Sequence, residues 1–439
     1  MNRISWIILT LFIFLSLNSE MLAKQAEYYF DGFNGSDKNP GTKNRPWKSF
    51  SKLKALALKP GDAVLFARGS SFHGSVAIKD SGTKNSPILF THYGKGHLPK
   101  FTNSDIRDRN GNVFLIQGSY IILDGLYFHN GPSVLPGTSG IVRKTGAVFV
   151  SIGANHNIIR NCEVYDYPIG FHIYGQNCLV TRNYIHDCTG FLQFPSWGPI
   201  GIMVATSNNE ISYNRIENYV VTGGTWGADG GAIEIDNSKI PKENIKIHHN
   251  HSVGNEGFLE LINPCDVSNV HVHHNISDDY QQFIAWDTTT TPSNFMVEHN
   301  TVIRTHKENA CPLFTVFYYR EKGPDPDASW LTFRNNIFYT TWQPALDPFN
   351  YPHDHNLFYT PGESATSDPV GYPLGPGDII ADPQFVDLAA RDLHLQSTSS
   401  AIDMGTDLGY TSDYVGNPVP IGPAPDAGAF EYQSYDGGS

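Results

Sequence analysis

The chain has 439 residues, of which 40% are hydrophobic, and it contains 41 Gly and 28 Pro. This length fits either two ordinary domains or one long repeat protein with a stable core. The formal net charge of −13 argues against binding to nucleic acid or to an anionic membrane, and it disfavours a strongly polyanionic substrate.

Residues 1–23 have the pattern of a secretory signal peptide. Arg3 precedes an apolar run over residues 6–17, and small or polar residues follow as far as Ala23. The apolar run is short for a membrane-spanning helix, which makes an N-terminal anchor the weaker interpretation. We therefore expect a secreted or periplasmic protein that inserts no segment into a membrane.

The next part of the chain predicts a strand, a helix and further strands. Residues 27–30 have the composition of a short strand, and residues 47–58 have helical periodicity that ends before a Pro-Gly pair. A repeat structure needs its open end covered, so we interpret the helix as an N-terminal cap. Strands are expected at residues 62–67, 86–92 and 113–116.

An Asn-containing motif recurs through the middle of the chain. Asn250, Asn275 and Asn300 are separated by 25 residues each, and each lies between two short strand-like segments. Stacked Asn side chains can hydrogen-bond to one another along the axis of a stack, so we expect a structural role at a corner of each repeat. The same role is expected for Asn161, Asn183, Asn214, Asn335, Asn336 and Asn356.

A second repeat brings acidic residues together. The segment 230–236 is echoed at residues 257–261 and 282–287, which is the signature of a solenoid in which each repeat adds one coil. Side chains alternate along a strand, so the Ile and Leu residues of these segments face the core and the acids face outward. Coils lie ~4.8 Å apart, which predicts one patch of carboxyl groups. The four acids of this patch are Glu234, Asp236, Glu260 and Asp287.

Longer intervals between the Asn residues mark insertions beside this patch. The interval from Asn183 to Asn214 is 31 residues, and the intervals from Asn214 to Asn250 and from Asn300 to Asn336 are 36 residues each. Loops on a rigid scaffold often carry function, and aromatic rings stack on the apolar faces of sugars. The candidate substrate-binding residues lie on or near these insertions or on an earlier outward strand face: Trp226, Trp197, His172, Tyr174, Tyr318 and Arg320.

The C-terminal part, residues 341–439, is rich in Pro, Gly and Asp. We interpret it as the final irregular coils and a C-terminal cap rather than a separate domain. The expected organisation is a signal peptide over 1–23 and one domain over 24–439. Within that domain, residues 24–110 form the N-terminal cap and first coils, and residues 111–340 form the central coils with the active-site cleft.

The chain resembles the secreted polysaccharide-degrading enzymes of the pectate-lyase-like superfamily. The opening segment 28–37, together with Pro46-Trp47, the segment 59–62 and Gly82-Thr83, is similar to the start of many such enzymes. The resemblance implies an all-β fold, namely a single-stranded right-handed parallel β-helix solenoid with an N-terminal capping helix. The superfamily contains lyases, glycoside hydrolases, epimerases and esterases, so the reaction must be inferred from the site.

The acidic patch fits glycoside hydrolysis, which needs one protonated and one ionised carboxyl group. Crowded like charges help to keep one of them protonated. Glu234 with Asp236 resembles the acid and base pair of β-helix ι-carrageenases, and Asp236 with Glu260 resembles the nucleophile and acid/base pair of β-helix β-xylosidases. We rank Asp236 and Glu260 first as catalytic residues and Glu234 next, with Asp287 and Asp229 as supporting acids. The expected activity is cleavage of a plant or algal polysaccharide or its oligosaccharides, without a cofactor.

The chief alternative is a Ca²⁺-dependent lyase that acts by β-elimination on a uronate, with the same acids as calcium ligands. Its base would be Lys239, Lys242, Arg304 or Arg320, and none of them falls in a strand column beside the acids. A carbohydrate-binding β-helix without activity is the second alternative. The His-rich corners lie away from the acids, so no transition-metal site is expected. The five cysteines do not suggest a disulfide framework, and buried free thiols are expected.

Overall fold

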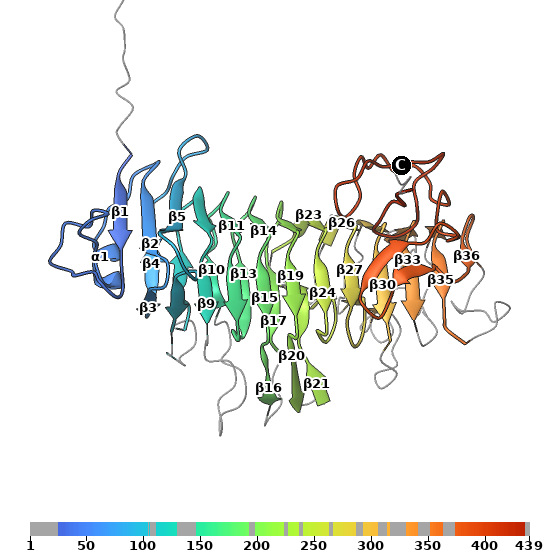
Figure 1. The fold of residues 1–439 in the computed structure, drawn as a ribbon, viewed down its shortest axis with the longest axis horizontal. Helices are drawn as coiled ribbons and strands as arrows, with labels where there is room; N and C mark the ends of the chain where they lie inside the picture. Colours follow the sequence, from blue (N-terminus) through green and yellow to red (C-terminus); the bar gives the residue numbers. More distant parts are fainter. Residues whose placement is uncertain are drawn as a thin grey trace, which may run out of the picture.

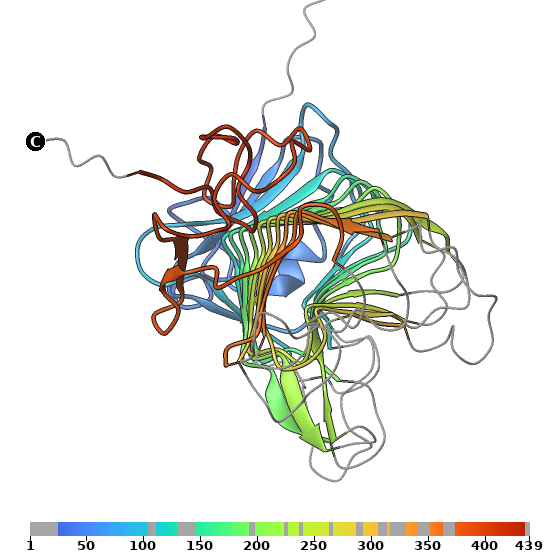
Figure 2. The ribbon, with the colours of Figure 1, turned by 90° about the vertical axis from the view of Figure 1, so that its right-hand side faces the viewer.

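The computed structural model describes residues 25–103, 105, 111–129, 146–192, 198–223, 227–236, 240–262, 267–286, 293–305, 314–316, 331–340, 352–362 and 374–434. Their strands form three long sheets that run along the length of the molecule (Figure 1). The chain visits the three sheets in turn and then pairs each strand in parallel with the strand one coil earlier. Viewed along the axis, the coils superpose around a common interior (Figure 2). The predicted all-β parallel solenoid is therefore confirmed.

Sheet 1 has twelve strands, and within each coil the chain then passes through sheet 2 and sheet 3, which are described below. Its strands include the predicted segments 27–30, 62–67 and 86–92, which the structure places at β1, β2 and β5. In spatial order, they are β1 (Glu27–Phe30), β2 (Ala63–Ala67), β5 (Ile88–Tyr93), β8 (Ile121–Asp124), β11 (Ile158–Arg160), β14 (Leu179–Thr181), β18 (Glu210–Ser212), β23 (Lys242–His248), β26 (Val267–His273), β29 (Ser293–Glu298), β32 (Leu331–Arg334) and β34 (His353–Asp354).

Sheet 2 also has twelve strands, most of them short, and follows sheet 1 after a tight corner. In spatial order, they are β3 (Ser71–His73), β6 (Lys100–Thr102), β9 (Tyr127–His129), β12 (Glu163–Tyr165), β15 (Tyr184–His186), β19 (Arg215–Glu217), β24 (His251–Val253), β27 (Ile276–Asp278), β30 (Thr301–Arg304), β33 (Ile337–Thr340), β35 (Leu357–Tyr359) and β36 (Ile379–Ile380).

Sheet 3 has nine strands and carries the acidic segments. In spatial order from the N-terminal end, they are β4 (Val76–Ile78), β7 (Phe114–Ile116), β10 (Gly146–Val150), β13 (Ile169–Ile173), β17 (Ile200–Val204), β22 (Gly231–Ile235), β25 (Leu259–Leu261), β28 (Ile284–Trp286) and β31 (Phe314–Val316).

A small three-stranded sheet stands out from the coils next to sheet 3 (Figures 1 and 2). It consists of β16 (Thr189–Leu192), β20 (Val220–Gly223) and β21 (Gly227–Asp229), which come from the two predicted insertions. Gly230 joins β21 to β22 with a φ of 129°, which a side-chain-bearing residue rarely adopts. The insertions thus form structure of their own directly before the strands β17 and β22.

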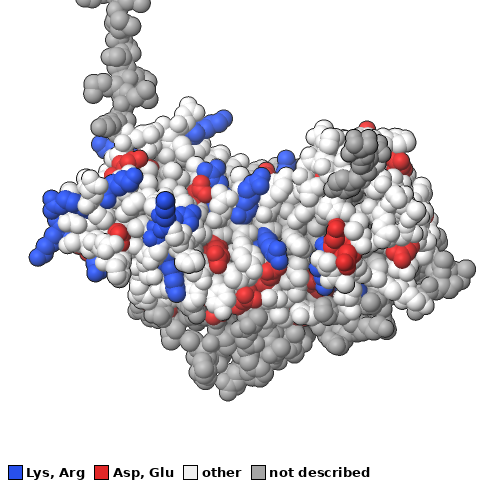
Figure 3. Space-filling view, viewed as in Figure 1, with Lys and Arg blue, Asp and Glu red and all other residues white. Residues whose placement is uncertain are grey.

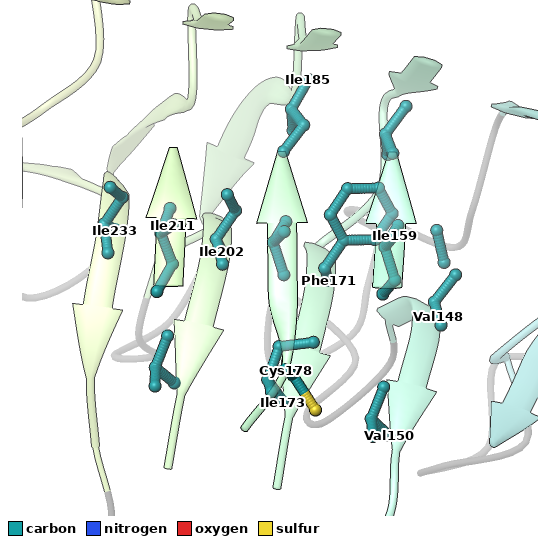
Figure 4. Close-up of a cluster of buried hydrophobic side chains, with 14 of the residues drawn as sticks. Val148, Val150, Ile159, Phe171, Ile173, Cys178, Ile185, Ile202, Ile211 and Ile233 are labelled. Carbon is teal, nitrogen blue, oxygen red and sulfur yellow. The ribbon is translucent and has the colours of Figure 1, made fainter. Parts of the chain in front are cut away.

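The core is built by the inward half of each strand. Ile202, Ile233 and Leu259 follow one another in register on β17, β22 and β25, and none is more than 2% exposed. Figure 4 shows how such side chains from neighbouring coils fill the interior. Each buried aliphatic side chain contributes roughly 1.5–3 kcal/mol, so the continuous core holds successive coils in register.

The corner between sheets 1 and 2 contains the predicted Asn ladder. Asn250 Nδ2 donates to Asn275 Oδ1 at 3.0 Å, and Asn275 Nδ2 donates to Asn300 Oδ1 at 3.0 Å. All members are buried, which confirms their structural role. The ladder runs through Asn183, Asn214, Asn250, Asn275, Asn300, Asn336 and Asn356.

Asn161 and Asn335 have structural contacts at the same corner, because Asn161 Nδ2 donates to Asp124 Oδ1 at 2.8 Å and the buried Asn335 Nδ2 donates to the Thr406 carbonyl oxygen at 2.8 Å. Neither residue is a member of the ladder, so that part of the prediction was wrong for them. Cys162 occupies the ladder position that was predicted for Asn161, because the backbone N–H of Cys162 donates to Asn183 Oδ1 at 3.0 Å. Asn161 and Asn335 lie one residue earlier, with φ values of 53° and 56°. Asn tolerates this left-handed conformation well, so it occurs at either of two adjacent corner positions and the motif alone does not separate them.

The predicted capping helix over residues 47–58 is much shorter in the structure. Helix α1 spans only Phe50–Leu53, with Ser49 as its N-cap, and a capping helix is therefore not confirmed. Phe50 still packs in the core, where its ring stacks on Phe72 and Phe101 with centroids 5.8 and 5.9 Å apart. Leu53 and Leu58 also pack in the core, so these apolar positions are held by tertiary packing, and a short helix has little stability of its own.

The C-terminal region differs from the predicted end cap. Residues 352–362 and 374–380 belong to the final coils, but residues 381–434 fold back along the outside of sheet 2 (Figure 1). The hairpin of β37 (Phe385–Asp387) and β38 (Asp392–Leu395) packs with Ile276, Ile303 and Ile337, which point outward from sheet 2. These contacts cover a side of the solenoid because those outward positions are apolar.

Candidate functional site

The acids form part of one outward column on sheet 3. Glu234 of β22 pairs directly with Glu260 of β25, and Ala285 of β28 follows Glu260. Their strand neighbours Ile233 and Leu259 face the core, as the alternation predicts. The alignment of the acidic repeats is therefore confirmed for Glu234 and Glu260.

Asp236 lies one outward position further along the same coil. Its backbone N–H donates to the Val204 carbonyl oxygen at 3.0 Å, which continues the ladder just beyond β22. Asp236 therefore lies diagonally across from Glu260, whereas Glu234 lies directly beside Glu260 on the adjacent strand. Asp287, the fourth acid of the predicted patch, lies outside the described residues.

The three acids differ in exposure. Glu234 is only 3% exposed, whereas Glu260 and Asp236 are half-buried. Two ionised carboxylates about 5 Å apart repel each other by roughly 3 kcal/mol at an effective dielectric constant of about 20. Crowding of this kind disfavours the simultaneous ionisation of neighbouring carboxyl groups.

Apolar and aromatic side chains continue the Glu234 column toward the N-terminus. Met203, His172 and Phe149 precede Glu234 on β17, β13 and β10, one strand each. The Phe149 ring lies 4.8 Å from His172 and 5.5 Å from Tyr174, measured between centroids. Tyr174 belongs to the second outward column, in which Ala205 and then Asp236 follow it along the axis.

The structure thus places His172 and Tyr174 on the predicted face, two coils from Glu234. Tyr174 is half-buried, so part of its ring is accessible. His172 is only 1% exposed and packs against both Phe149 and Tyr174. Its burial suits a residue that supports the neighbouring rings, and its predicted contact with substrate stays a prediction.

The other predicted site residues cannot be placed by their side chains. The backbone of Asp229 ends β21 and pairs with Val221, but its side chain is not among those described. Four further predicted contacts with substrate also lie outside the described residues: Trp197, Trp226, Tyr318 and Arg320.

Two of the cationic residues considered as lyase bases have structural roles. Lys242 is 1% exposed, and its Nζ donates to the Ile240 carbonyl oxygen at 2.8 Å. Arg304 is 5% exposed, and its Nη2 donates to the Tyr280 carbonyl oxygen at 2.9 Å. Lys239 and Arg320 lie outside the described residues.

Sequence reasoning missed Phe149 and Met203. They share the Glu234 column with His172, at intervals of 23 residues from Phe149 to His172 and 31 from His172 to Met203. The signal was present in the alternation of residues 146–150 and 200–204, but neither position is acidic. Only the register of the strands shows that they extend the acidic column.

The histidines gather at the corner of sheets 1 and 2, away from sheet 3. The rings of His249, His274 and His299 stack along the axis with centroids 5.2 and 4.8 Å apart. The C-terminal region covers them, with Tyr414 stacked on His249. Burial lowers the pKa of His249 and of His299 to about 4, so these rings are neutral at pH 7. Across the described ranges, no group of three or more His, Cys, Asp or Glu side chains has metal-binding geometry.

The outer surface bears both signs of charge. Basic and acidic side chains are interspersed along the face in Figure 3, with the basic ones most frequent over the N-terminal half. Cys162, Cys178 and Cys188 are buried free thiols, as expected for these three, whereas Cys265 and Cys311 lie outside the described residues. The described chain contains no helix with the length and apolar character of a membrane span.

Comparison with known proteins supports the architecture. A family model described as a right handed beta helix region matches residues 88–302. The uncharacterized protein YwoF of Bacillus subtilis (strain 168) is 34% identical over 67 residues. That match covers 15% of this chain and 14% of YwoF, so it is a local similarity.

Solved structures with the same fold include three carbohydrate-related proteins. Pectate lyase Pel9A has a TM-score of 0.54 at 15% identity, over 93% of this chain and 97% of its own. The GH136 lacto-N-biosidase from Eubacterium ramulus has a TM-score of 0.52 at 15% identity, over 77% of this chain and 64% of its own. XylC in complex with xylose has a TM-score of 0.51 at 11% identity, over 93% of this chain and 99% of its own. At these identities the likeness concerns the fold alone. The chain is therefore a right-handed parallel β-helix protein.

Proposed function

We propose that this protein is a secreted glycoside hydrolase in which Glu234 and Glu260 form the catalytic carboxyl pair. The observation that carries the proposal is their direct pairing on the outward face of adjacent strands. A third acid, Asp236, lies one outward position away. Glycoside hydrolysis needs such a pair within reach of one glycosidic bond.

The difference in burial supports a division of roles. Glu234 is almost completely buried beside Met203, and burial favours the neutral form of a carboxyl group. We assign it the general acid, which donates a proton to the leaving oxygen. Glu260 is half-buried and more easily ionised, so we assign it the nucleophile or the base toward water. This order differs from the sequence-based ranking, which placed Asp236 before Glu234.

The choice of pair predicts the stereochemistry. Residues paired across adjacent parallel strands lie ~4.8 Å apart, which suits the ~5 Å separation of carboxyl groups in retaining enzymes. The diagonal from Asp236 to Glu260 is about 8 Å long, which lies within the ~6.5–9.5 Å of inverting enzymes. The proposed Glu234–Glu260 pair therefore predicts retention of the anomeric configuration.

A carbohydrate substrate is supported by the names of the neighbours with this fold, a lacto-N-biosidase, a pectate lyase and XylC with xylose. One of these is a lyase, so the fold leaves the reaction open. The roles of Lys242 and Arg304 as buried backbone-bound cations favour hydrolysis, because neither is then available as the base for β-elimination.

The test is a panel of plant and algal polysaccharides assayed for new reducing ends, with Glu234→Gln and Glu260→Gln beside the wild type. Each variant should lose activity by about 10²–10⁴-fold, the usual contribution of acid–base catalysis. Glu243→Gln is the matched control, because Glu243 is an exposed glutamate on the neighbouring strand β23. Full activity in Glu234→Gln or in Glu260→Gln would contradict the assignment of that residue.

Azide offers a sharper test of Glu260. If Glu260 is the nucleophile, azide should restore turnover of an activated glycoside by Glu260→Ala and yield a glycosyl azide of inverted configuration. Rescue of Glu234→Ala with retained configuration would mark Glu234 as the acid/base. An inverted glycosyl azide from Glu234→Ala together with a retained one from Glu260→Ala would show that Glu234 is the nucleophile and Glu260 the acid/base.

A further inference from the structure

The outward face of sheet 3 changes character along the helix axis. On the coils before Glu234, the first outward column holds Leu115, Phe149, His172 and Met203. The second column holds Ser151, Tyr174 and Ala205 before it reaches Asp236. These positions are apolar, aromatic or small, whereas the next two coils carry three carboxyl groups.

Three rings form a compact cluster on the apolar side. Phe149 and Tyr174 are near-parallel, with an interplanar angle of 24° and centroids 5.5 Å apart. His172 lies 4.8 Å from each of them, at angles of 73° and 49°. Phe149 and Tyr174 are half-buried, while His172 is buried and fixes both rings from the side.

The cluster is continuous with the acids through strand register. One strand, β17, separates His172 from Glu234, so the two side chains are about 10 Å apart along the axis. Phe149 is one coil further away, at about 14 Å. A pyranose residue in an extended chain covers about one coil, so the rings would meet sugars two to three positions from the cleaved bond.

Charge selects between classes of sugar. Asp236 and Glu260, the two acids that do not hold the proton in the proposed function, place negative charge on neighbouring positions, and this charge repels a uronate bound across them. Aromatic rings gain from contact with the apolar C–H face of a sugar, which requires no charge on the ligand. The face therefore suits an uncharged glycan better than a polyuronate.

We infer that Phe149 and Tyr174, held by His172, form a binding subsite for an uncharged sugar, and that the substrate is a neutral glycan laid along the helix axis over at least about three residues. This inference rests on the proposed function for the position of the cleaved bond. It adds Phe149 as a specificity-determining residue and defines the chemical class of the substrate.

Binding measurements test the subsite independently of turnover. Titration calorimetry on full-length Glu234→Gln would use neutral oligosaccharides of xylose, galactose and N-acetylglucosamine of graded length, with oligogalacturonates of matched length as the anionic probe. We expect at least one neutral series to bind, with affinity that increases with length until the chain reaches Phe149. No binding to any neutral series, or tighter binding of the oligogalacturonates, would overturn the inference.

Substitutions then locate the subsite. Tyr174→Ala and Phe149→Ala in the Glu234→Gln background should each weaken binding of the longer oligosaccharides about fivefold to tenfold and leave the shortest binding ligand unchanged. Tyr174→Phe, which keeps the ring, should bind like its parent. Tyr184→Ala is the control, because Tyr184 is a 36%-exposed tyrosine on sheet 2. Equal losses for short and long ligands would assign the rings a structural role and refute the subsite.

The two proposals fail in different ways. Length-dependent binding of a neutral glycan that wild-type protein does not hydrolyse would refute the proposed function and leave the subsite intact. Hydrolysis of oligogalacturonates in preference to neutral glycans would leave the proposed function intact and refute the inference.

Discussion

Replacing Asn275 by Ala should be among the most destabilising single changes in the protein. Asn275 is fully buried, and its side chain makes four hydrogen bonds. Its Nδ2 donates to the Ile247 carbonyl oxygen and to Asn300 Oδ1, and its Oδ1 accepts from the backbone N–H and the Nδ2 of Asn250. Each hydrogen bond contributes about 1 kcal/mol net, and the buried polar groups of Asn250, Ile247 and Asn300 that lose their partner add to the destabilisation. We therefore expect the free energy of unfolding to fall by about 4–6 kcal/mol.

Equilibrium unfolding in urea measures this change, and Asn269→Gly provides a matched control on the same coil. Asn269 also belongs to a chain of Asn side chains, in which its Nδ2 donates to Asn244 Oδ1 at 2.6 Å, but it is solvent-facing. Its φ of 51° suits Gly, so the control should lose no more than about 1 kcal/mol. Equal destabilisation by the two substitutions would refute the argument that burial makes the inner ladder important.

Three further predictions concern buried titratable groups. Burial lowers the pKa of His249 to about 4, so as the pH falls below about 6.5 this histidine takes up a proton in the unfolded chain before it does so in the folded protein. The free energy of unfolding should therefore be constant above pH 6.5 and decrease by up to roughly 3 kcal/mol toward pH 4. His249→Asn should reduce this slope in urea unfolding at a series of pH values, and an unchanged slope would contradict the assignment. Arg391→Gly keeps the left-handed backbone but removes the guanidinium that pairs with the buried Asp278, whose pKa burial raises to about 6. The loss of stability should be about 2 kcal/mol at pH 8 and smaller at pH 5, where Asp278 is protonated; a loss independent of pH would show that the ion pair contributes little. Burial raises the pKa of the Cys162 and Cys178 thiols to about 12, so peptide mapping after alkylation at pH 8 should find both labelled only in the unfolded chain.

The repeat architecture could be predicted because its signals lie within short stretches of the sequence. The Asn interval of 25 residues and the alternation around Glu234 and Glu260 each depend on one coil and its neighbour. Register within a stack is then forced, since a slip by one residue would turn the core face outward. The displacement of Asn161 from the ladder shows the limit of this argument, because two adjacent corner positions accept the same residue.

The features that were not predicted depend on contacts between distant parts of the chain. The predicted helix over residues 47–58 is replaced by one turn at residues 50–53, although Leu53 and Leu58 also pack in the core, so their burial alone does not specify a helix. The return of residues 381–434 along sheet 2 depends on apolar outward positions such as Ile276 and Ile303, which single strands do not reveal. In the site, the place of Phe149 beside Tyr174 follows from strand register across coils with insertions of unequal length.

The central claim is that carboxyl groups on sheet 3 hydrolyse a glycosidic bond, and the mass balance of the products tests it most directly. An oligosaccharide cleaved by the wild-type protein would be analysed by mass spectrometry in ordinary water and in ¹⁸O-labelled water. Hydrolysis predicts products whose masses sum to the substrate plus one water, with one solvent oxygen incorporated, and loss of both products in Glu234→Gln. Products that sum to the mass of the substrate alone, with an unsaturated sugar in one of them, would show β-elimination and contradict the account.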